Sequence, residues 1–100
     1  MIGDPGAIRA LARPLRRRAD ELHTLSDRLL DQARATSWQG VAADAMLVAV
    51  GGSANGLRRT ADLHDEAADA LERHADHVAA ALAAIEGALH ALKRVMGAVT

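Results

Sequence analysis

The chain has 100 residues, enough for one small domain, and half of them are apolar. About a quarter of the chain is Ala and its only aromatic residue is Trp38, so it needs close helix packing or a partner to bury enough surface. The absence of Cys excludes a disulfide framework and thiolate metal sites, and the net charge of −1 gives no bulk attraction to nucleic acid or anionic lipid. No apolar run approaches the length of a membrane span and no signal-peptide core is present, so neither a stable span nor general secretion is expected.

The first predicted helix covers residues about 5–36. Asp4 can cap its free N–H groups, and Pro5 suits its first turn. Pro14 conflicts with a helix interior, because it lacks a backbone donor and clashes one turn back. We therefore expect either a kink near Arg13 or a helix that begins around Pro14. The large apolar residues recur at spacings of three and four and form one stripe: Ile8, Leu11, Leu15, Leu22, Leu25 and Leu29.

Residues 37–40, Ser-Trp-Gln-Gly, lack this pattern and are predicted to form a turn. Gly40 can adopt the positive φ that other residues resist. Trp38 can cover the open end of a helical hairpin with one large side chain. We therefore assign Trp38 and Gly40 a structural role in the turn.

A second, longer helix is predicted over residues about 41–96, because the apolar period resumes after Gly40 and keeps its phase. The mean spacing of 3.5 residues is typical of supercoiled helix packing, and one row carries Ala from 54 to 75. Gly51 and Gly52 weaken the helix locally at about 1 kcal/mol each. Since the phase survives them, we expect a continuous but bendable helix.

The charges favour an antiparallel hairpin, so the fold class is all-α and the whole chain, 1–100, is one domain. A reversal at 37–40 places position n opposite position 76 minus n, which sets arginines of the first helix against acids of the second. Pro5 then lies opposite about Leu71, and the apolar seam beyond it has no cover. We expect this uncovered seam to join a second hairpin in a dimer packed as a four-helix bundle. The predicted partner interface is Leu71, Val78, Leu82, Ile85, Leu89, Leu92 and Met96.

Other chemistry is less well supported by the residues. His74 and His77 lie one helical turn apart, but a third metal ligand on that face is not evident, so no metal site is assigned. The five histidines could instead make assembly pH-sensitive. No catalytic constellation, phosphate loop or deep cleft is readable, so neither an enzyme nor a cofactor is expected. The basic run 13–18 is followed at once by Asp20 and Glu21, which argues against nucleic-acid binding.

The Trp38-Gln39-Gly40 turn between two amphipathic helices resembles the WXG-motif family of small type VII secretion proteins. The likeness extends past the tripeptide to a small helix-opening segment that ends in Ala45 and the bulky Met46, and it covers essentially the whole chain.

The resemblance implies a non-enzymatic helical hairpin that pairs with itself, with a related hairpin or with the helical N-terminal region of a larger toxin. Such proteins are made in the cytoplasm and exported folded by an ATP-driven type VII machine. Export commonly uses a Tyr-x-x-x-Asp/Glu signal after the second helix of one partner, and this chain has no Tyr. The resemblance therefore favours a substrate or an escort whose partner carries the signal. A generic cytoplasmic coiled-coil adaptor is the alternative.

Overall fold

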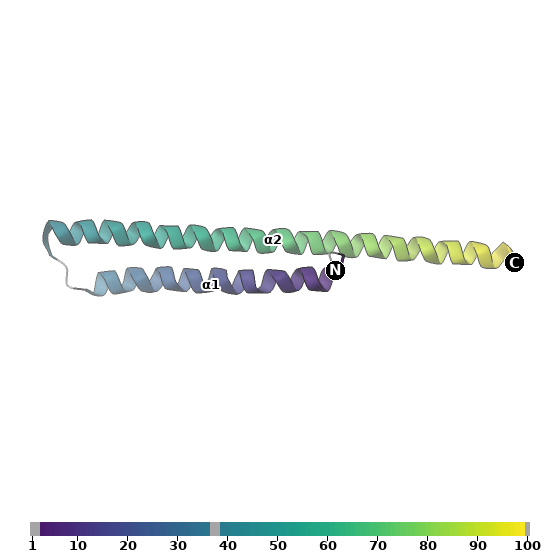
Figure 1. The fold of residues 1–100 in the computed structure, drawn as a ribbon, viewed down its shortest axis with the longest axis horizontal. Helices are drawn as coiled ribbons and strands as arrows, with labels where there is room; N and C mark the ends of the chain where they lie inside the picture. The colour runs from purple at the N-terminus through teal and green to yellow at the C-terminus, as the bar shows by residue number, and fades with distance from the viewer. Residues whose placement is uncertain (1–2, 37–38, 100) are drawn as a thin grey trace.

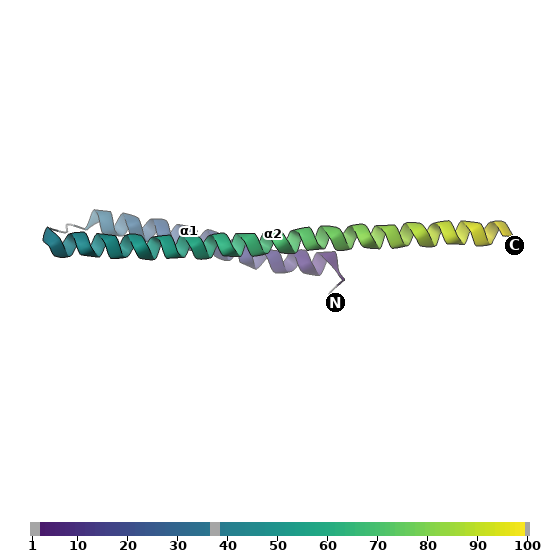
Figure 2. The ribbon, with the colours of Figure 1, turned by 90° about the horizontal axis from the view of Figure 1, so that it is seen from above.

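The computed structural model describes residues 3–36 and 39–99 and shows two helices running antiparallel (Figure 1). Helix α1 spans Pro5–Ala35 and α2 spans Gly40–Val99. The described residues form an elongated body of 90 × 17 × 14 Å (Figure 2), because α2 is almost twice as long as α1. The predicted all-α helical hairpin is confirmed.

Local capping signals fix the ends of α1. The Asp4 carboxylate accepts a hydrogen bond from the Gly6 N–H at 2.9 Å, as an N-cap residue should. At the other end, the Thr36 N–H donates to the Gln32 carbonyl at 3.2 Å. The helix is continuous through Pro14, so the alternative in which it begins at Pro14 is wrong. Pro14 is exposed, so the carbonyl that loses its partner one turn back can bond to water instead.

Gly40 opens α2 with a φ of +82°, the left-handed conformation that the sequence predicted for it. Trp38 lies outside the described residues. Beyond Gly40, α2 runs without a break through Gly51 and Gly52.

A row of small residues on each helix forms the core of the hairpin. Ser26 marks the contact between the rows: its hydroxyl is buried and donates to the Ala54 carbonyl at 3.0 Å. Small side chains allow the two backbones to approach closely along this seam. Both rows repeat every seven residues: Ala12, Ala19, Ser26 and Ala33 on α1, and Ala54, Ala61, Ala68 and Ala75 on α2.

The two helices are out of the predicted register. Position 76 minus n places Arg9 opposite residue 67, whereas Arg9 forms an ion pair with Asp76. The shift is nine residues at this ion pair and four at the Ser26–Ala54 hydrogen bond, and it has a geometric cause. Figure 1 shows the first turns of α2 projecting past the last turn of α1, so the reversal takes up more helix length than a tight turn would.

Candidate interaction surface

The small-residue seam divides the hairpin into two sides. On both helices, residues four positions after a seam residue turn to one side, and residues three positions after it turn to the other. The first set includes Arg16 and His23 on α1 with Asp65 and Glu72 on α2. We call this the charged side.

Arg16 is the centre of the charged side. Its guanidinium contacts Glu72 and Asp69 at 2.7 Å each and Asp65 at 3.6 Å. The hydrogen bond from Arg16 holds the pKa of Glu72 below its usual range, and the bonds to Glu72 and Asp69 raise the pKa of Arg16. Each of these side chains keeps more than a third of its surface exposed to water, so the pairs orient the helices more than they stabilise them.

Further ion pairs continue along the same side in both directions. Arg9 meets Asp76 at 2.9 Å and His23 meets Asp62 at 3.5 Å. Nearer the turn the signs reverse, and Arg58 of α2 meets Asp27 of α1 at 3.2 Å. The antiparallel charge pairing is therefore present, although most of its partners differ from those that the predicted register implied.

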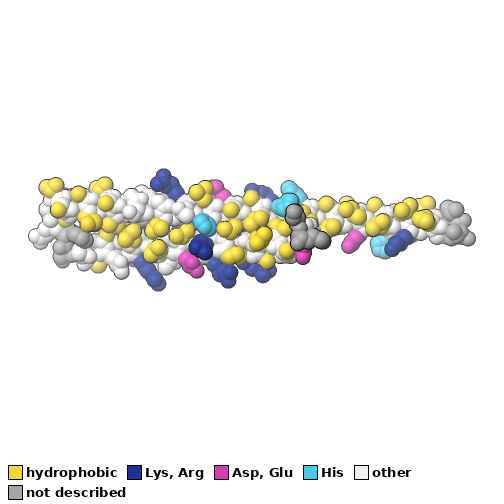
Figure 3. All heavy atoms as spheres, viewed as in Figure 1, with side chains coloured by type: hydrophobic (Ala, Val, Ile, Leu, Met, Phe, Trp, Pro, Cys, Tyr) yellow, Lys and Arg dark blue, Asp and Glu magenta, His cyan; other side chains and the backbone are white. Residues whose placement is uncertain are grey.

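The other side is largely apolar, with Arg18 and His64 among its side chains, and Figure 3 shows a band of hydrophobic side chains along it. Its large side chains are half-buried or exposed, because α1 and α2 cover them only from one direction. We call this the apolar side. It comprises Leu11, Leu15, Leu22, Leu25 and Leu29 of α1 with Val50, Leu57, His64, Leu71 and Val78 of α2.

The apolar side continues onto the part of α2 that α1 does not reach. Every residue from 80 to 98 is exposed, and we call this segment the overhang. The large side chains of its seam are between 43% and 60% exposed: Leu82, Ile85, Leu89, Leu92 and Met96.

The structure therefore places the residues of the predicted partner interface in two regions, beside α1 and in the overhang. Leu71 and Val78 are half-buried beside α1, because the register shift moves the end of α1 toward residue 80. The other five residues of the prediction lie in the overhang. The sequence analysis did not predict that α1 leaves large apolar side chains exposed, although the exposed Leu11 and Leu25 belong to the apolar stripe that it identified.

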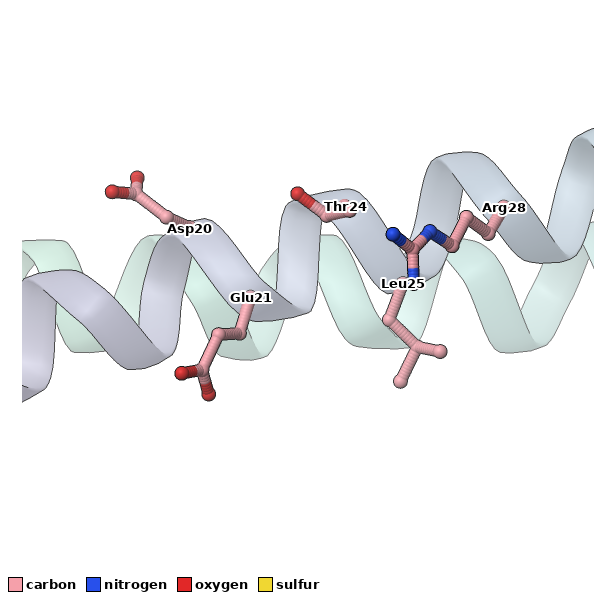
Figure 4. A pocket seen from close by; sticks show the side chains of 5 residues that line it. All are labelled: Asp20, Glu21, Thr24, Leu25 and Arg28. Carbon is pink, nitrogen blue, oxygen red and sulfur yellow. The ribbon is translucent and has the colours of Figure 1, made fainter.

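Among the described residues, no concave site on this surface has the character of an active site. One shallow depression is lined by Asp20, Glu21, Thr24, Leu25 and Arg28. All five come from α1, and Figure 4 shows Asp20 and Glu21 pointing to opposite sides of the helix. Within residues 3–36 and 39–99, no group of three His, Cys, Asp or Glu side chains could hold a metal ion.

One helix of the described chain, Gly40–Ala98, is long and apolar enough to cross a membrane by length and composition alone. Its most apolar stretch reaches a mean hydropathy of 1.2, and 11% of that stretch is buried. The expectation that no apolar run approaches the length of a membrane span is therefore wrong by this criterion. This is weak evidence for a span, because α2 also carries the acidic residues that pair with Arg9 and Arg16.

Comparison with known proteins gives one match. Neither the curated proteins nor the solved structures contain a match to this chain. A family model matches residues 1–98, nearly the full length of the sequence, and its subject is secretion through the type VII system (T7SS). This association supports export through a type VII system and a secreted substrate rather than an enzyme. The chain thus belongs to the family described as "Putative T7SS secretion signal domain".

Proposed function

We propose that this chain is a non-enzymatic type VII secretion protein of the WXG type that is exported as a pair of hairpins. The observation that carries the proposal is the continuous apolar surface formed by the overhang and the apolar side. Fully burying each large side chain would contribute about 1.5–3 kcal/mol. Soluble monomers rarely leave so long a contiguous apolar strip in water.

A second copy of the chain is the occupant that this surface fits. Each copy offers a single uncovered helix at one end and a two-helix apolar face along the rest of its length. In an antiparallel pair related by a two-fold axis, the overhang of each copy lies along the apolar side of the other. The same patch is then buried on both chains, and the central region becomes a four-helix bundle.

The charged side is left at the surface in this arrangement. Arg9, Arg16 and Arg58 already pair there with acids of the other helix, and burying these exposed charges would cost more free energy than the contact returned. The apolar side therefore forms the interface, and the charged side stays exposed to water.

These 100 residues lack the Tyr-based export signal of the family that the chain resembles. The sequence contains no Tyr, so the Tyr-x-x-x-Asp/Glu signal of the family that it resembles is absent from these residues. We infer that the pair acts as a partner in an exported assembly, in which a larger type VII substrate supplies the signal.

The experiment compares Leu82→Asp/Leu89→Asp with a control, Ala83→Asp/His90→Asp, which adds two carboxylates at the same spacing on another face of the overhang. Sedimentation at micromolar concentration should show a dimer for wild type and control and a monomer for the first variant. A strain with an intact type VII system should export wild type and control into the medium and should not export the first variant.

Circular dichroism must show that both variants stay helical. A compact wild-type monomer, or an apolar-face variant that pairs and is exported like the control, would refute the proposed interface. Loss of pairing without loss of export would show that export does not need the pair.

A further inference from the structure

One cation interrupts the apolar side of α1. Arg18 stands seven residues after Leu11 and seven before Leu25, so it occupies their row, and it is exposed. Among the described residues it forms no ion pair, whereas Arg16 on the charged side contacts three acids. A partner that covers this row must therefore also accommodate a guanidinium that no acid of its own chain engages.

The neighbours of Arg18 within the hairpin offer it little compensation. Of the residues one helical turn away on α1, only Glu21 is charged, and it forms no ion pair with Arg18. Across the seam, α2 presents His64 on the apolar side, while Asp65 contacts Arg16 on the charged side. An acid that pairs with Arg18 along the apolar side has to come from a second chain.

The overhang carries one acid. Glu86 is the only Asp or Glu between residues 80 and 98. It is exposed, and it forms no ion pair in the part of the chain that the structure describes. Because it lies one helical turn from both Leu82 and Leu89, its carboxylate borders the large apolar side chains of the overhang.

The proposed pair brings these two charges to the same boundary. The α2 helices of the two copies run antiparallel, so the overhang of one copy runs parallel to α1 of the other. When the two α2 helices meet through the row of Leu57 and Ile85, the rows of Leu89 and Glu86 turn toward α1. The row of Glu86 then runs beside the row of Arg18, as e and g positions flank the core of a coiled coil.

We propose that Arg18 of each copy pairs with Glu86 of the other and that this contact fixes the register of the two hairpins. The inference rests on the proposed function, because it concerns the same surface. Arg18 beside Glu86 is an offset of 68 residues (86 − 18), which lays residues 80–98 along residues 12–30 of α1. That stretch of α1 holds four leucines of the apolar side: Leu15, Leu22, Leu25 and Leu29.

The neighbouring registers leave both charges without a suitable partner. Since the apolar rows repeat every seven residues, they also match when one chain slides by one heptad. Arg18 would then stand beside Ala79 or Lys93, and Glu86 would stand beside a leucine and lose water without gaining a cation. Apolar contacts do little to distinguish these registers, so the charge pair selects one of them.

The first test measures the dissociation constant of the purified chain by sedimentation. Arg18→Glu and Glu86→Arg should each raise it at least about tenfold, because the two-fold pair contains the contact twice. Arg18→Glu/Glu86→Arg should return it to within about threefold of wild type, since the double reversal restores opposite charges. The control, Arg17→Glu, makes the same charge change on another face of α1 and should stay at the wild-type value.

Disulfide cross-linking reads the register directly, because the sequence has no Cys of its own. Leu25→Cys/Lys93→Cys places two thiols at the same offset of 68 residues (93 − 25), and oxidation should join two copies. Lys93 lies in the overhang, which α1 of its own chain does not reach. The matched control, Gln32→Cys/Lys93→Cys, has the offset of the next register, 61 residues (93 − 32), and should not cross-link. Circular dichroism must show that all variants are equally helical.

The outcomes separate the two proposals. A pair whose dissociation constant does not respond to the single reversals overturns this inference and leaves the proposed pairing intact. A double reversal that binds no better than the single ones also overturns it, as does cross-linking of the control in place of Leu25→Cys/Lys93→Cys. A wild-type chain that is monomeric at micromolar concentration overturns the self-pair and, with it, the register contact.

Discussion

The same heptad row of α2 has opposite character in the hairpin and in the overhang. Where α1 covers the row it holds only Ala, at 54, 61, 68 and 75, and each is essentially fully buried. Beyond the end of α1 the row continues as Leu82, Leu89 and Met96, all exposed. The side chains of this row thus change from Ala to Leu and Met at the point where α1 ends.

This difference shows which kind of neighbour each region needs. Ala lets a helix approach to about 8 Å, whereas Leu and Met require a separation nearer 10 Å and interdigitating side chains. A longer α1 would therefore not fit the overhang in the way that it fits the hairpin. The proposed pair meets this requirement, because the second copy brings large apolar side chains of its own to the overhang.

The largest expected effect comes from exchanging residue size between the two regions. Ala61→Leu forces a Leu into the close seam, and overpacking of this kind costs about 1–3 kcal/mol of unfolding free energy. Leu89→Ala should leave the stability of the isolated hairpin almost unchanged, because this side chain is half exposed. Urea denaturation followed by circular dichroism at low protein concentration measures both.

An unchanged stability of Ala61→Leu would contradict the difference described between the hairpin and the overhang. If Ala61→Leu were as stable as wild type, the helices would not be in close contact along the small-residue row. In the proposed pair, Leu89→Ala should instead raise the dissociation constant, which sedimentation at micromolar concentration measures.

An effect no larger than that of Ala61→Leu is expected from two glycines of α2, one at its start and one in the overhang. Gly40→Val places a β-branched residue at φ +82°, which costs about 1–3 kcal/mol even though no atom lies within 4 Å of the added Cβ. Gly87→Ala in the overhang meets ordinary helical geometry and open space, so it should raise helix stability by about 0.5–1 kcal/mol. Thermal melts of the two variants should move in opposite directions, and equal shifts would show that Gly40 needs no special backbone.

The smallest effect should come from the charged side. The hydrogen bond from Arg16 lowers the pKa of Glu72, so this carboxylate contributes stability above the pKa of the unfolded chain, about 4.3. That contribution is lost as the pH falls through the lower pKa of the folded state. Glu72→Gln should slightly lower the melting temperature at pH 7 and make no difference once the pH lies below the folded-state pKa of Glu72.

The matched control for this variant is Glu86→Gln in the overhang. Glu86 has no ion-pair partner within the part of the chain that the structure describes. The melting temperature of Glu86→Gln at low protein concentration should therefore stay at the wild-type value. An equal drop in both variants would mean that general charge, and not the contact with Arg16, sets the effect.

The sequence by itself determined the two helices and the residues that mark where they start. Asp4 and Pro5 mark the start of α1, and Gly40 supplies the positive φ at the start of α2. These features depend on neighbours within a few residues, which is why they can be read along the chain. The antiparallel arrangement and the exposed apolar residues of the overhang also followed from the pattern of charge and hydrophobicity.

Only the tertiary structure decided the register and the true seam. The large Leu residues of α1 dominate its apolar stripe, yet the row that meets α2 holds Ala12, Ala19 and Ser26, while the Leu residues lie to one side. Many alignments of two seven-residue repeats look alike in sequence. The length consumed by the reversal and the ion pairs from Arg9 and Arg16 select one of them, and both are properties of two helices placed side by side.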